Sequence, residues 1–385
     1  MAIVKKFFSI FRRKNTSGVV VGNNEAYDSL RLMSSNATSN FDFGEISQQK
    51  AAWFGHSSHF AKLFSNISLI KDNDCNPEKF NRLIFWGIRG IGRFPKIREC
   101  PNKAVIAEDG FIRSILSGVA KGSQKKFSKA CSVIFDDLAP HFAGEFVTRI
   151  EQKLNSDFSL SESELLRSKA AIDKIVRNNI TKYNFQKLDE IKLPGNKTKK
   201  VLIIDQTAMD ASITYSNLTA DSYSTMLLDA IKENPDSDII IKTHPDSILS
   251  NRSDLAGFFN ADNTNYPNVY LYAQTVNPII LINMVDRVYV GSSGVGMEAI
   301  LCKKEVFCYG VPFYAGWGLT VDRNEFFTSN KLQQRRSKKR TKEELFYSFY
   351  IWYTHYINPE TDSVCEIEQA LDFILKCREE FLVEG

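Results

Sequence analysis

Residues 288–323, VYVGSSGVGMEAILCKKEVFCYGVPFYAGWGLTVDR, contain the pattern that decides the fold. A short apolar strand is followed by the turn GSSG at 291–294, a predicted helix over 296–302 and a second predicted strand over 305–308. Backbone N–H groups and the helix dipole both point at such a turn, so the pattern predicts a phosphate-binding site. Glu298 lies near the start of the helix, where a carboxylate can accept hydrogen bonds from ribose hydroxyls. The alternative is an ordinary βαβ crossover with a serine cap.

The neighbouring segments favour a binding site in an α/β fold. Residues 310–320 place three glycines, a proline and three aromatics in one loop, a composition that core packing alone rarely requires. Upstream, predicted strands and helices alternate, which argues for a parallel, doubly wound sheet. The predicted strands are 201–204, 239–242 and 269–272, and the predicted helices are 222–233 and 278–284.

The first half of the chain contains a second set of strands and helices. Predicted strands cover 82–86 and 104–107, and the second one ends in the acidic turn EDG at 108–110. Two carboxylates at the end of a strand lie at the carboxyl edge of a sheet, the usual position of a site in an open α/β fold, although Asp-Gly is also a common turn. A capping box begins the predicted helix 162–179. The polar residues 192–200 are the predicted linker between two domains.

The N-terminal region differs from the rest of the chain. Residues 1–14 mix Lys and Arg with Phe and Ile, lack a signal-peptide cleavage site, and are typical of a segment that lies on an anionic membrane surface; a frayed basic tail is the alternative. Residues 15–50 are rich in Ser, Asn, Thr and Gly and predict a poorly ordered or weakly helical linker. Over 51–70 the apolar residues are spaced as on a helix. His56 and His59 lie one turn apart there, and we expect a solvated face rather than a metal site.

The composition is that of a globular protein with two domains. Its 385 residues exceed the usual size of a single hydrophobic core. The fractions of hydrophobic (43%) and charged (24%) residues are those of a globular protein. A net charge of +4 is too small to indicate nucleic-acid binding. The seven cysteines are scattered without a C-x-x-C pair, so we expect neither a zinc site nor a disulfide framework, but reduced thiols in the cytoplasm. No run of apolar residues is long enough to predict a membrane span.

A basic run, RRSKKRTK at 335–342, follows the central stretch. Such a run is usually a solvated face; a surface for an anionic lipid headgroup or polymer is the sharper alternative. Thr341 and Glu344 form a capping box, which predicts a helix over 342–356 whose aromatic residues belong to the core.

Several motifs together resemble the capsule polysaccharide synthesis family of bacterial glycosyltransferases, in motif order from Arg82 to Ala370. The resemblance implies an α/β fold of the GT-B type, in which two Rossmann-like, doubly wound domains face a central cleft. It also implies a retaining β-Kdo transferase that uses CMP-Kdo to build the lipid-linked Kdo primer of capsules. Some relatives carry two such modules, whereas this chain has room for one. The motifs are AEDGFIRS at 107–114, IDQTAMDAS at 204–212, KTHPD at 242–246 and GVPFYAGWGLTVDR at 310–323.

The shifts in composition and the predicted linker divide the chain into segments, and the resemblance implies their roles. They are a basic, poorly ordered N-terminal segment (1–50), an acceptor-side Rossmann-like domain (51–196), a CMP-sugar-binding Rossmann-like domain (197–330) and C-terminal helices that pack back on the domains (331–385).

Short signatures predict the donor site. EDG at 108–110, HP at 244–245 and SS at 292–293 resemble the motif set of bacterial sialyltransferases, which also use a CMP-activated keto-sugar acid. The departing CMP carries a phosphate whose charge must be neutralised, and serine hydroxyls, backbone amides and a histidine can do this. A lone histidine after a strand is otherwise structural, but the KTHPD pattern favours a functional role. The residues expected to bind the donor are Lys242, His244, Pro245, Ser292, Ser293, Gly294 and Glu298.

Retaining transfer by double displacement needs one carboxylate as nucleophile and a second group as acid/base. We expect Asp210 to be the nucleophile and His244 to assist. Glu108, on the facing domain, is the expected acid/base, with a pKa raised by burial and by the neighbouring Asp109. Asp205 follows its strand directly, where it can cap the turn. The resemblance also favours Asp210, because the DAS triplet that it begins is the part shared within the family.

We expect no metal and no cofactor, with CMP-Kdo as the donor substrate. The D-x-D patterns at 72–74 and 236–238 lie in polar contexts where such matches arise by chance. The expected partners are the CMP-sugar donor, a lipid-linked glycan acceptor, an anionic membrane surface and other capsule biosynthesis proteins, but no nucleic acid. The expected location is cytoplasmic, peripherally associated with the inner membrane.

Other functions remain open at this point. Another CMP-sugar, such as a sialic acid donor, would suit the same motifs. A UDP-sugar 2-epimerase has a similar fold, but the EDG and DAS motifs argue against it. A non-catalytic polymer-binding partner in capsule export would have no need of carboxylates at Glu108 and Asp210.

Overall fold

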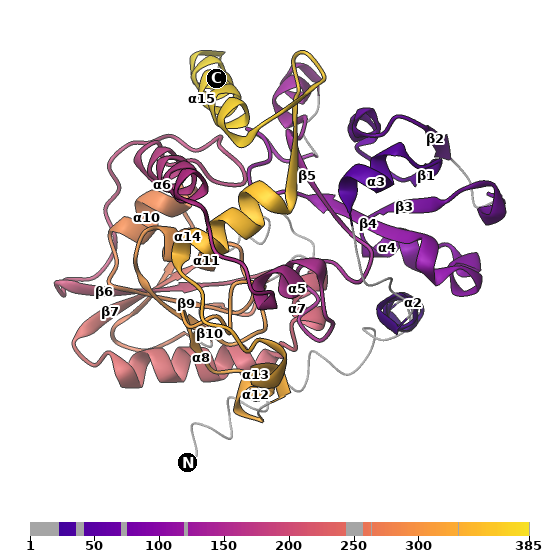
Figure 1. Cartoon of the computed structure of the whole chain (residues 1–385). Helices are drawn as coiled ribbons and strands as arrows, with labels where there is room; N and C mark the ends of the chain where they lie inside the picture. Colours follow the sequence, from indigo (N-terminus) through magenta and orange to yellow (C-terminus); the bar gives the residue numbers. More distant parts are fainter. Residues whose placement is uncertain are drawn as a thin grey trace.

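The computed structural model describes residues 23–35, 42–70, 75–118, 122–243, 257–262, 264–329 and 331–384. The segment 1–14, the D-x-D pattern at 72–74, and both His244 and Pro245 lie outside these ranges. The described residues form two α/β lobes, which Figure 1 shows with the first in indigo and purple and the second in salmon and orange.

The first lobe is built on a seven-stranded sheet with the order β13-β12-β5-β4-β3-β1-β2. Strands β2, β1, β3 and β4 pair in parallel, whereas β5, β12 and β13 add antiparallel pairs, so this sheet is mixed rather than wholly parallel. Its strands are β1 (Ala51–Phe54), β2 (Ile67–Ile70), β3 (Arg82–Trp86), β4 (Ala104–Asp109), β5 (Ser132–Asp136), β12 (Thr354–Asn358) and β13 (Ser363–Cys365). The helices of this half are α2 (Asn23–Ser35), α3 (Phe43–Gln48), α4 (Ile88–Gly92), α5 (Arg149–Asn155), α6 (Glu162–Arg177) and the 3₁₀ turns Ser58–Leu63, Pro77–Lys79, Pro95–Glu99, Pro101–Lys103 and Gly122–Ser128.

The second lobe is built on a six-stranded sheet with the order β11-β10-β9-β6-β7-β8, in which every pairing is parallel. The alternation of strands and helices predicted this parallel sheet, and the prediction is confirmed. The strands are β6 (Lys199–Ile204), β7 (Ser237–Lys242), β8 (Val269–Tyr272), β9 (Arg287–Val290), β10 (Glu305–Cys308) and β11 (Val321–Asp322). The helices are α7 (Ala211–Tyr215), α8 (Ala220–Glu233), α10 (Pro278–Asn283), α11 (Val295–Leu301), α12 (Glu325–Thr328), α13 (Lys331–Arg335), α14 (Lys342–Phe346), a π-helix (Tyr347–Trp352) and α15 (Ile367–Glu384).

Strand β6 shows why the second lobe needs continuous apolar runs. Successive side chains of a strand point to opposite faces of the sheet. Val201 and Ile203 pack with α8 on one face, while Leu202 and Ile204 join the cluster that contains α10 and α11 on the other. Helices cover both faces, as in Figure 1, so all four residues are buried and the strand cannot alternate between apolar and polar residues.

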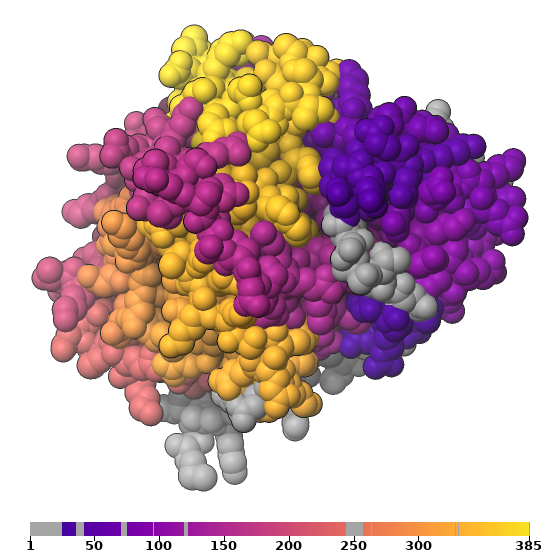
Figure 2. Space-filling view, viewed as in Figure 1, coloured from indigo at the N-terminus to yellow at the C-terminus, as the bar shows by residue number. Residues whose placement is uncertain are grey.

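The C-terminal segment ties the two lobes together. Strand β12 pairs antiparallel with β5 of the first lobe, while α15 forms ion pairs with α6 at 2.7 Å and 2.5 Å. Helix α6 buries Ile172 and Ile175 in the cluster that includes Ile279 and Ile300 of the second lobe. Figure 2 shows the yellow C-terminal segment between the magenta α6 region and the indigo first lobe. The chain therefore already packs on the second lobe before it reaches the expected linker at 192–200.

The basic run at 335–342 was expected to be a solvated face, and this expectation is wrong for three of its arginines, which bind other groups of the protein. Arg335 and Arg336 both pair with the buried carboxylate of Glu151, at 2.7 Å and 2.9 Å. Arg340 donates to the backbone carbonyls of Leu154, Ser156 and Phe158, at and just beyond the C-terminal end of α5, where the helix dipole favours a cation. These arginines are therefore committed to the protein itself.

One expectation for the N-terminal third is wrong, whereas for 15–50 the described residues show the helical alternative. Residues 51–54 and 67–70 form the parallel strands β1 and β2, with the 3₁₀ turn Ser58–Leu63 between them instead of the expected helix, because all four side chains of β1 are buried, on both faces of the first sheet. Within 15–50, helix α2 packs on α4 and buries Ala26, Leu30 and Met33, at positions i, i+4 and i+7. Three apolar residues are too few to stand out from the polar composition of that segment.

The helix predicted over 342–356 is shorter than expected. The capping box of Thr341 and Glu344 is present, and so is the one that begins α6. After α14 the chain continues as a π-helix and then becomes β12, whose register pairs Thr354 with Ile134. Pairing with β5 replaces the last helical turn. The C-terminal segment 331–385, which was expected to be helical, therefore also contains the strands β12 and β13.

Within the described ranges, no helix combines the length and the apolar character that crossing a lipid bilayer requires.

Candidate active site at the junction of the lobes

Glu108 is the second-last residue of strand β4 and is half-buried. The backbone N–H of Ile88, the first residue of α4, donates to its carboxylate. Burial and the neighbouring charge of Asp109 raise the pKa of Glu108 to about 7, Asp210 adds to this effect, and Lys182 opposes it. The predicted upward shift is therefore confirmed, and a carboxyl group with this pKa can accept or release a proton near neutral pH.

Asp109 acts on the site through its charge. It pairs with Arg113 at 2.8 Å, and Arg113 also donates to the carbonyl of Ser128 at 3.0 Å. The Oδ1 atom of Asp109 is buried and has no hydrogen-bond partner among the described residues. The ion pair holds Asp109 beside Glu108, where its negative charge disfavours the ionised form of Glu108.

Asp205 caps a turn, as the sequence predicted. The side chain is 1% exposed at the end of β6. Its Oδ1 accepts the backbone N–H groups of Gln206 and Phe258, both at 2.9 Å. A Cβ at Gly257 would lie 1.9 Å from Oδ2, so the backbone packs directly on the carboxylate. Burial raises the pKa of Asp205 to about 7, but these contacts leave no room for a sugar.

Asp210 has a different environment five residues later. It is exposed and caps the N-terminus of α7, with Oδ1 accepting the N–H of Ser212 at 2.8 Å. One carboxylate oxygen is thereby oriented by the backbone, and the other is left for a substrate. Asp210 and Glu108 come from different lobes and lie within Coulombic range of each other.

Gln206 connects the segment of Asp210 to the serine turn, although the sequence analysis assigned it no role. Its Oε1 accepts the N–H of Ser292 and the hydroxyl of Tyr223, both at 2.9 Å. Its Nε2 donates to the hydroxyls of Ser212 and Ser292, at 3.2 Å and 3.3 Å. A Cβ at Gly291 would lie 2.5 Å from the Tyr223 hydroxyl, so the network closes only around glycine. The only sequence signal was the position of Gln206 inside the motif IDQTAMDAS.

The serine turn (291–294) lies between β9 and α11 and is supported by the aromatic loop (310–320). Ser292 and Ser293 are half-buried and Gly294 is exposed. The hydroxyl of Tyr314 donates to the carbonyl of Ser293 at 2.5 Å. A Cβ at Gly296 would lie 2.2 Å from that hydroxyl, which explains the glycine. The aromatics of 310–320 are buried, so they support the turn instead of facing a ligand.

Glu298 does not face the serine turn. Its buried carboxylate accepts hydrogen bonds from the Thr181 hydroxyl and from the backbone N–H of Lys182. Burial raises the pKa of Glu298 to about 7. In this arrangement the residue ties α11 to the segment that follows α6, and its expected contact with a ribose would require these bonds to change.

His141 is a second residue that the sequence analysis missed. Its ring lies among Phe111 and Phe313, with centroid distances of 5.1 Å and 5.7 Å, from the segments after β4 and β10. The Nδ1 atom is buried and has no hydrogen-bond partner within the described part of the chain. Burial and then Lys182 lower the pKa of His141 to about 3, so this imidazole is neutral. The motif DDLAPH gave no local signal of a site.

Lys242 ends β7 on the same edge of the second sheet as Asp205. Its ammonium donates to the carbonyl of Thr243 at 2.7 Å, and burial lowers the pKa of Lys242 to about 8. His244 and Pro245 follow it directly in the chain but lie outside the described residues, so their expected roles stay predictions.

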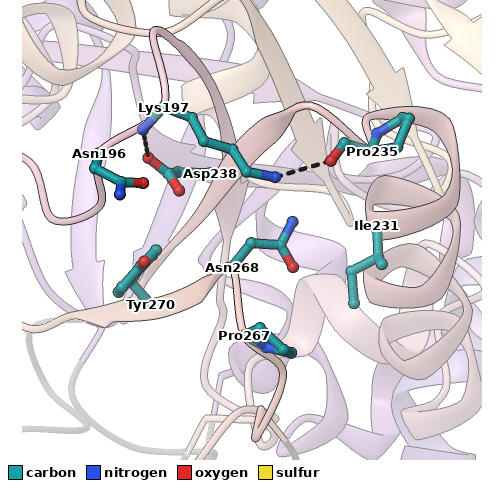
Figure 3. Close-up of a pocket in the computed structure, with 8 residues that line it drawn as sticks. All are labelled: Asn196, Lys197, Ile231, Pro235, Asp238, Pro267, Asn268 and Tyr270. Carbon is teal, nitrogen blue, oxygen red and sulfur yellow. Dashed lines mark hydrogen bonds between the residues drawn. The ribbon is translucent and has the colours of Figure 1, made fainter.

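A pocket of about 390 Å³ lies far from these groups, at the amino ends of β6, β7 and β8 (Figure 3). Its central acidic residue is Asp238, one of the two D-x-D aspartates. The buried carboxylate accepts the backbone N–H of Lys197 at 2.8 Å and pairs with Lys200 at 3.0 Å. Asp238 therefore anchors the linker, which fits the expectation that this D-x-D match arose by chance.

Among the residues that the structure describes, no three or more His, Cys, Asp or Glu side chains are placed to hold one metal ion. His59 instead shares a hydrogen bond of 2.8 Å with the carbonyl of Ala130.

Comparison with known proteins identifies a family. The model of the family described as capsule polysaccharide biosynthesis protein matches residues 143–356. The capsule polysaccharide modification protein LipA of Neisseria meningitidis serogroup B is 30% identical over 321 residues, which is 82% of this chain and 44% of LipA. The lipopolysaccharide-processing protein LpsZ of Rhizobium meliloti is 29% identical, over 75% of this chain and 62% of LpsZ. The chain thus spans less than two thirds of the length of either relative.

Solved structures agree with this result. The β-Kdo 2,4 transferase of Thermosulfurimonas dismutans KpsC is 27% identical and superposes with a TM-score of 0.72, covering 84% of this chain and 97% of that one. The β-Kdo 2,7 transferase of the same KpsC, at 20% identity and a TM-score of 0.61, covers 86% and 99% and shows the same fold. The expected GT-B-like α/β fold is confirmed.

Proposed function

The chain belongs to the capsule polysaccharide biosynthesis protein family and has the fold of a glycosyltransferase, and from this premise we propose that it is a retaining β-Kdo transferase. It transfers Kdo from CMP-Kdo to a lipid-linked acceptor during capsule biosynthesis. The observation that carries the proposal is the meeting of Glu108 and Asp210, from two lobes, at the junction of the sheets.

The chemistry follows from the two environments. In the first step the free carboxylate oxygen of Asp210 attacks the anomeric carbon of Kdo, and the bond from that carbon to the phosphate oxygen of CMP breaks. An ester between Asp210 and Kdo forms, and CMP leaves with the electron pair. In the second step an acceptor hydroxyl attacks the same carbon and displaces Asp210. Its proton passes to Glu108, whose pKa of about 7 suits a base that must recover by releasing the proton to water.

Each of the two steps inverts the anomeric carbon, so the overall reaction retains its configuration. Asp205 is excluded from the nucleophile role because its carboxylate is engaged by backbone N–H groups and covered by Gly257. Asp210 has no such cover.

The serine turn is the proposed seat of the CMP phosphate. Ser292 donates its N–H to Gln206 and its hydroxyl to the carbonyl of Ser212, so it joins the turn to the Asp210 segment, and the hydroxyl and amide of Ser293 are the proposed phosphate donors. A phosphate held there would leave the anomeric carbon near Asp210. Lys242 ends β7, the strand that pairs with β6, and His244 and Pro245 come after it in the sequence; the three complete the proposed donor site, and Glu298 supports the turn through α11.

The two KpsC structures carry β-Kdo 2,4 and 2,7 transferase in their names. The higher identity, 27%, is to the 2,4 enzyme. We extend to this chain the transfer of Kdo in a β linkage, and leave the linkage position to be determined by the product.

The test is incubation with CMP-Kdo generated in situ and a synthetic lipid-linked acceptor, followed by mass analysis of the product. The expected result is a mass increase of one or more Kdo residues, in β linkage by NMR. Transfer from CMP-sialic acid alone, or transfer with inversion, would contradict the proposal.

The proposed site of action is the cytoplasmic face of the inner membrane, through residues 1–14. Deletion of residues 2–14 is expected to lower recovery in the membrane fraction while activity on a soluble acceptor persists. Unchanged partitioning would remove this role from the segment.

A further inference from the structure

Lys182 lies where the chain passes between the lobes, and its backbone is held on both sides. Its carbonyl accepts the N–H groups of Arg113 and Ser114, at 3.2 Å and 3.3 Å, just after the EDG motif of the first lobe. Its own N–H donates to Glu298 of α11 in the second lobe. Thr181 adds a hydroxyl bond to the same carboxylate. The main chain at this residue is therefore anchored to the segments that carry both halves of the site.

Lys182 is nevertheless an exposed residue. Its ammonium lies 6.0 Å from the centroid of the Tyr183 ring and within Coulombic range of Glu108 and Asp109. Asp109 is already paired with Arg113 at 2.8 Å. Within the described part of the chain Lys182 belongs to no ion pair, so its charge is available at the site.

The charge balance of the site calls for such a group. Glu108, Asp109 and Asp210 bring negative charge to one place. A keto-sugar acid adds its own carboxylate on the anomeric carbon, the atom that must reach Asp210. Like charges at this range repel one another unless a nearby cation offsets them. Lys242 interacts with Asp205 instead, and Arg113 is engaged by Asp109.

We infer that Lys182 binds the carboxylate of the transferred keto-sugar acid and thereby places the anomeric carbon between Asp210 and Glu108. This inference rests on the proposed function and deepens it by naming the residue that distinguishes a sugar acid from a neutral sugar. The neutral imidazole of His141, whose ring lies close enough to Lys182 to feel its charge, adds no competing cation.

The same ammonium adjusts the acid/base group. The charged groups that face Glu108 are Asp109, Lys182 and Asp210, and Lys182 is the one that lowers its pKa. Removing this positive charge raises the pKa of Glu108 further. The limb of the pH–rate profile that belongs to Glu108 therefore moves to higher pH, whether Glu108 acts as an acid or as a base.

The experiment compares Lys182→Met and Lys182→Arg with Lys187→Met, an exposed lysine on the same segment. Dissociation constants are measured for CMP and for CMP-Kdo, and kcat, KM and the pH profile are measured with acceptor. Lys182→Met is expected to weaken CMP-Kdo binding by about tenfold or more, the value of a charge-assisted hydrogen bond, and to leave CMP binding within about twofold. It also shifts the pH limb upward. Lys182→Arg recovers most of the binding, and Lys187→Met matches the wild type.

The outcomes separate this inference from the proposed function. Equal weakening of CMP and CMP-Kdo by Lys182→Met would show a phosphate contact or a structural role and overturn the inference, as would wild-type behaviour. If the wild type transfers no Kdo, the proposed function fails, and the binding comparison is repeated with CMP-sialic acid, which also carries an anomeric carboxylate. Loss of preference for that donor over CMP in Lys182→Met alone would still support the role of Lys182; an unchanged preference would refute it.

Discussion

Asp205 and Asp210 show how two similar carboxylates acquire different chemistry from their surroundings. Asp205 is buried and bound by backbone N–H groups, so it stabilises the loop that includes Phe258. Asp210 is exposed and oriented through one oxygen by the N–H of Ser212. A nucleophile must reach the anomeric carbon without first breaking several hydrogen bonds. Only Asp210 meets that condition.

Replacing Asp210 by Asn is therefore expected to lower turnover by at least about 10³-fold while CMP binding is retained, because the nucleotide contacts other residues. Intact-protein mass spectrometry of the wild type, exposed to donor without acceptor, should reveal one added Kdo on the peptide that contains Asp210. Asp205→Asn serves as the comparison and should lose stability more than chemistry. An adduct on another carboxylate would reassign the nucleophile.

We expect Glu108 to give the proposed reaction its pH dependence. Burial and Asp109 raise its pKa to about 7, so the ionised base becomes predominant only above neutral pH. The rate of acceptor transfer should rise with pH through this value and then level off. Glu108→Gln should remove the inflection and slow the reaction by about 10²- to 10⁴-fold. A profile that keeps the same inflection in the variant would assign the titration to another group.

At the scale of elements, a single amide joins three parts of the second lobe. Gln206 uses both hydrogens and its carbonyl oxygen on the serine turn, on α7 and on α8. The nucleophile segment and the proposed phosphate seat therefore move together. A displacement of one relative to the other would misplace the anomeric carbon.

Gln206→Leu preserves the approximate volume and removes these bonds, so we expect kcat/KM for CMP-Kdo to fall by about 10²-fold, the cost of a small misplacement of reacting groups. Tyr223→Phe removes one bond of the network and leaves those to the two serines, and we expect a much smaller loss. Steady-state kinetics with both variants, together with thermal unfolding, checks the order. Equal effects would mean that Gln206 acts only through Tyr223.

The junction of α5 with the 310–320 loop depends on a buried ion pair. Glu151 and Arg336 are 2% and 3% exposed and lie 2.9 Å apart, and Arg336 also donates to the carbonyls of Pro312 and Ala315, at 2.7 Å and 2.6 Å. Removing Arg336 takes away one of the two guanidinium partners of the buried Glu151, and it leaves the carbonyls of Pro312 and Ala315 without their donor.

Arg336→Met is expected to lower the free energy of unfolding by about 3–5 kcal/mol for that reason. Lys338→Met is the matched control, because its partner Asp157 is exposed, and it should cost about 0–1 kcal/mol. Urea unfolding monitored by tryptophan fluorescence measures both. Similar losses of unfolding free energy in the two variants would show that the buried pair stabilises the protein no more than an exposed ion pair does.

At the scale of the whole molecule, the two lobes are joined by elements whose place in the structure differs from their place in the chain. Strand β12 belongs to the first sheet although it follows the whole second lobe in the chain, and α6 precedes the second sheet but packs on it. The site therefore forms only when both lobes are folded and correctly joined. A ligand held on the second lobe stabilises the assembly through that joint.

CMP should raise the melting temperature by several degrees at about 100 times its dissociation constant, which corresponds to about 2.7 kcal/mol. UDP should have a smaller effect, and Ser293→Ala should reduce the CMP shift. Differential scanning fluorimetry provides the measurement. Equal shifts with CMP and UDP would contradict a cytidine-specific donor site.

The sequence by itself determined the parallel second sheet, the two capping boxes and the placement of carboxylates at strand ends. These features are local: apolar runs, turn residues and caps are readable within about ten residues, and parallel strands bring their carboxyl ends to one edge. The contrast between Asp205 and Asp210 was readable for the same reason, since one follows its strand directly and the other lies on the next loop.

Only the tertiary structure decided which distant residues meet. Strand β12 replaced part of a predicted helix because β5, more than 200 residues earlier, offered a free edge. Arg335, Arg336 and Arg340 donate to groups of α5, a helix about 180 residues earlier in the chain. Gln206, His141 and Lys182 carry no local signal, because their importance comes from partners on other segments. Pairings across such distances depend on the packing of complete lobes, which no short stretch of sequence contains.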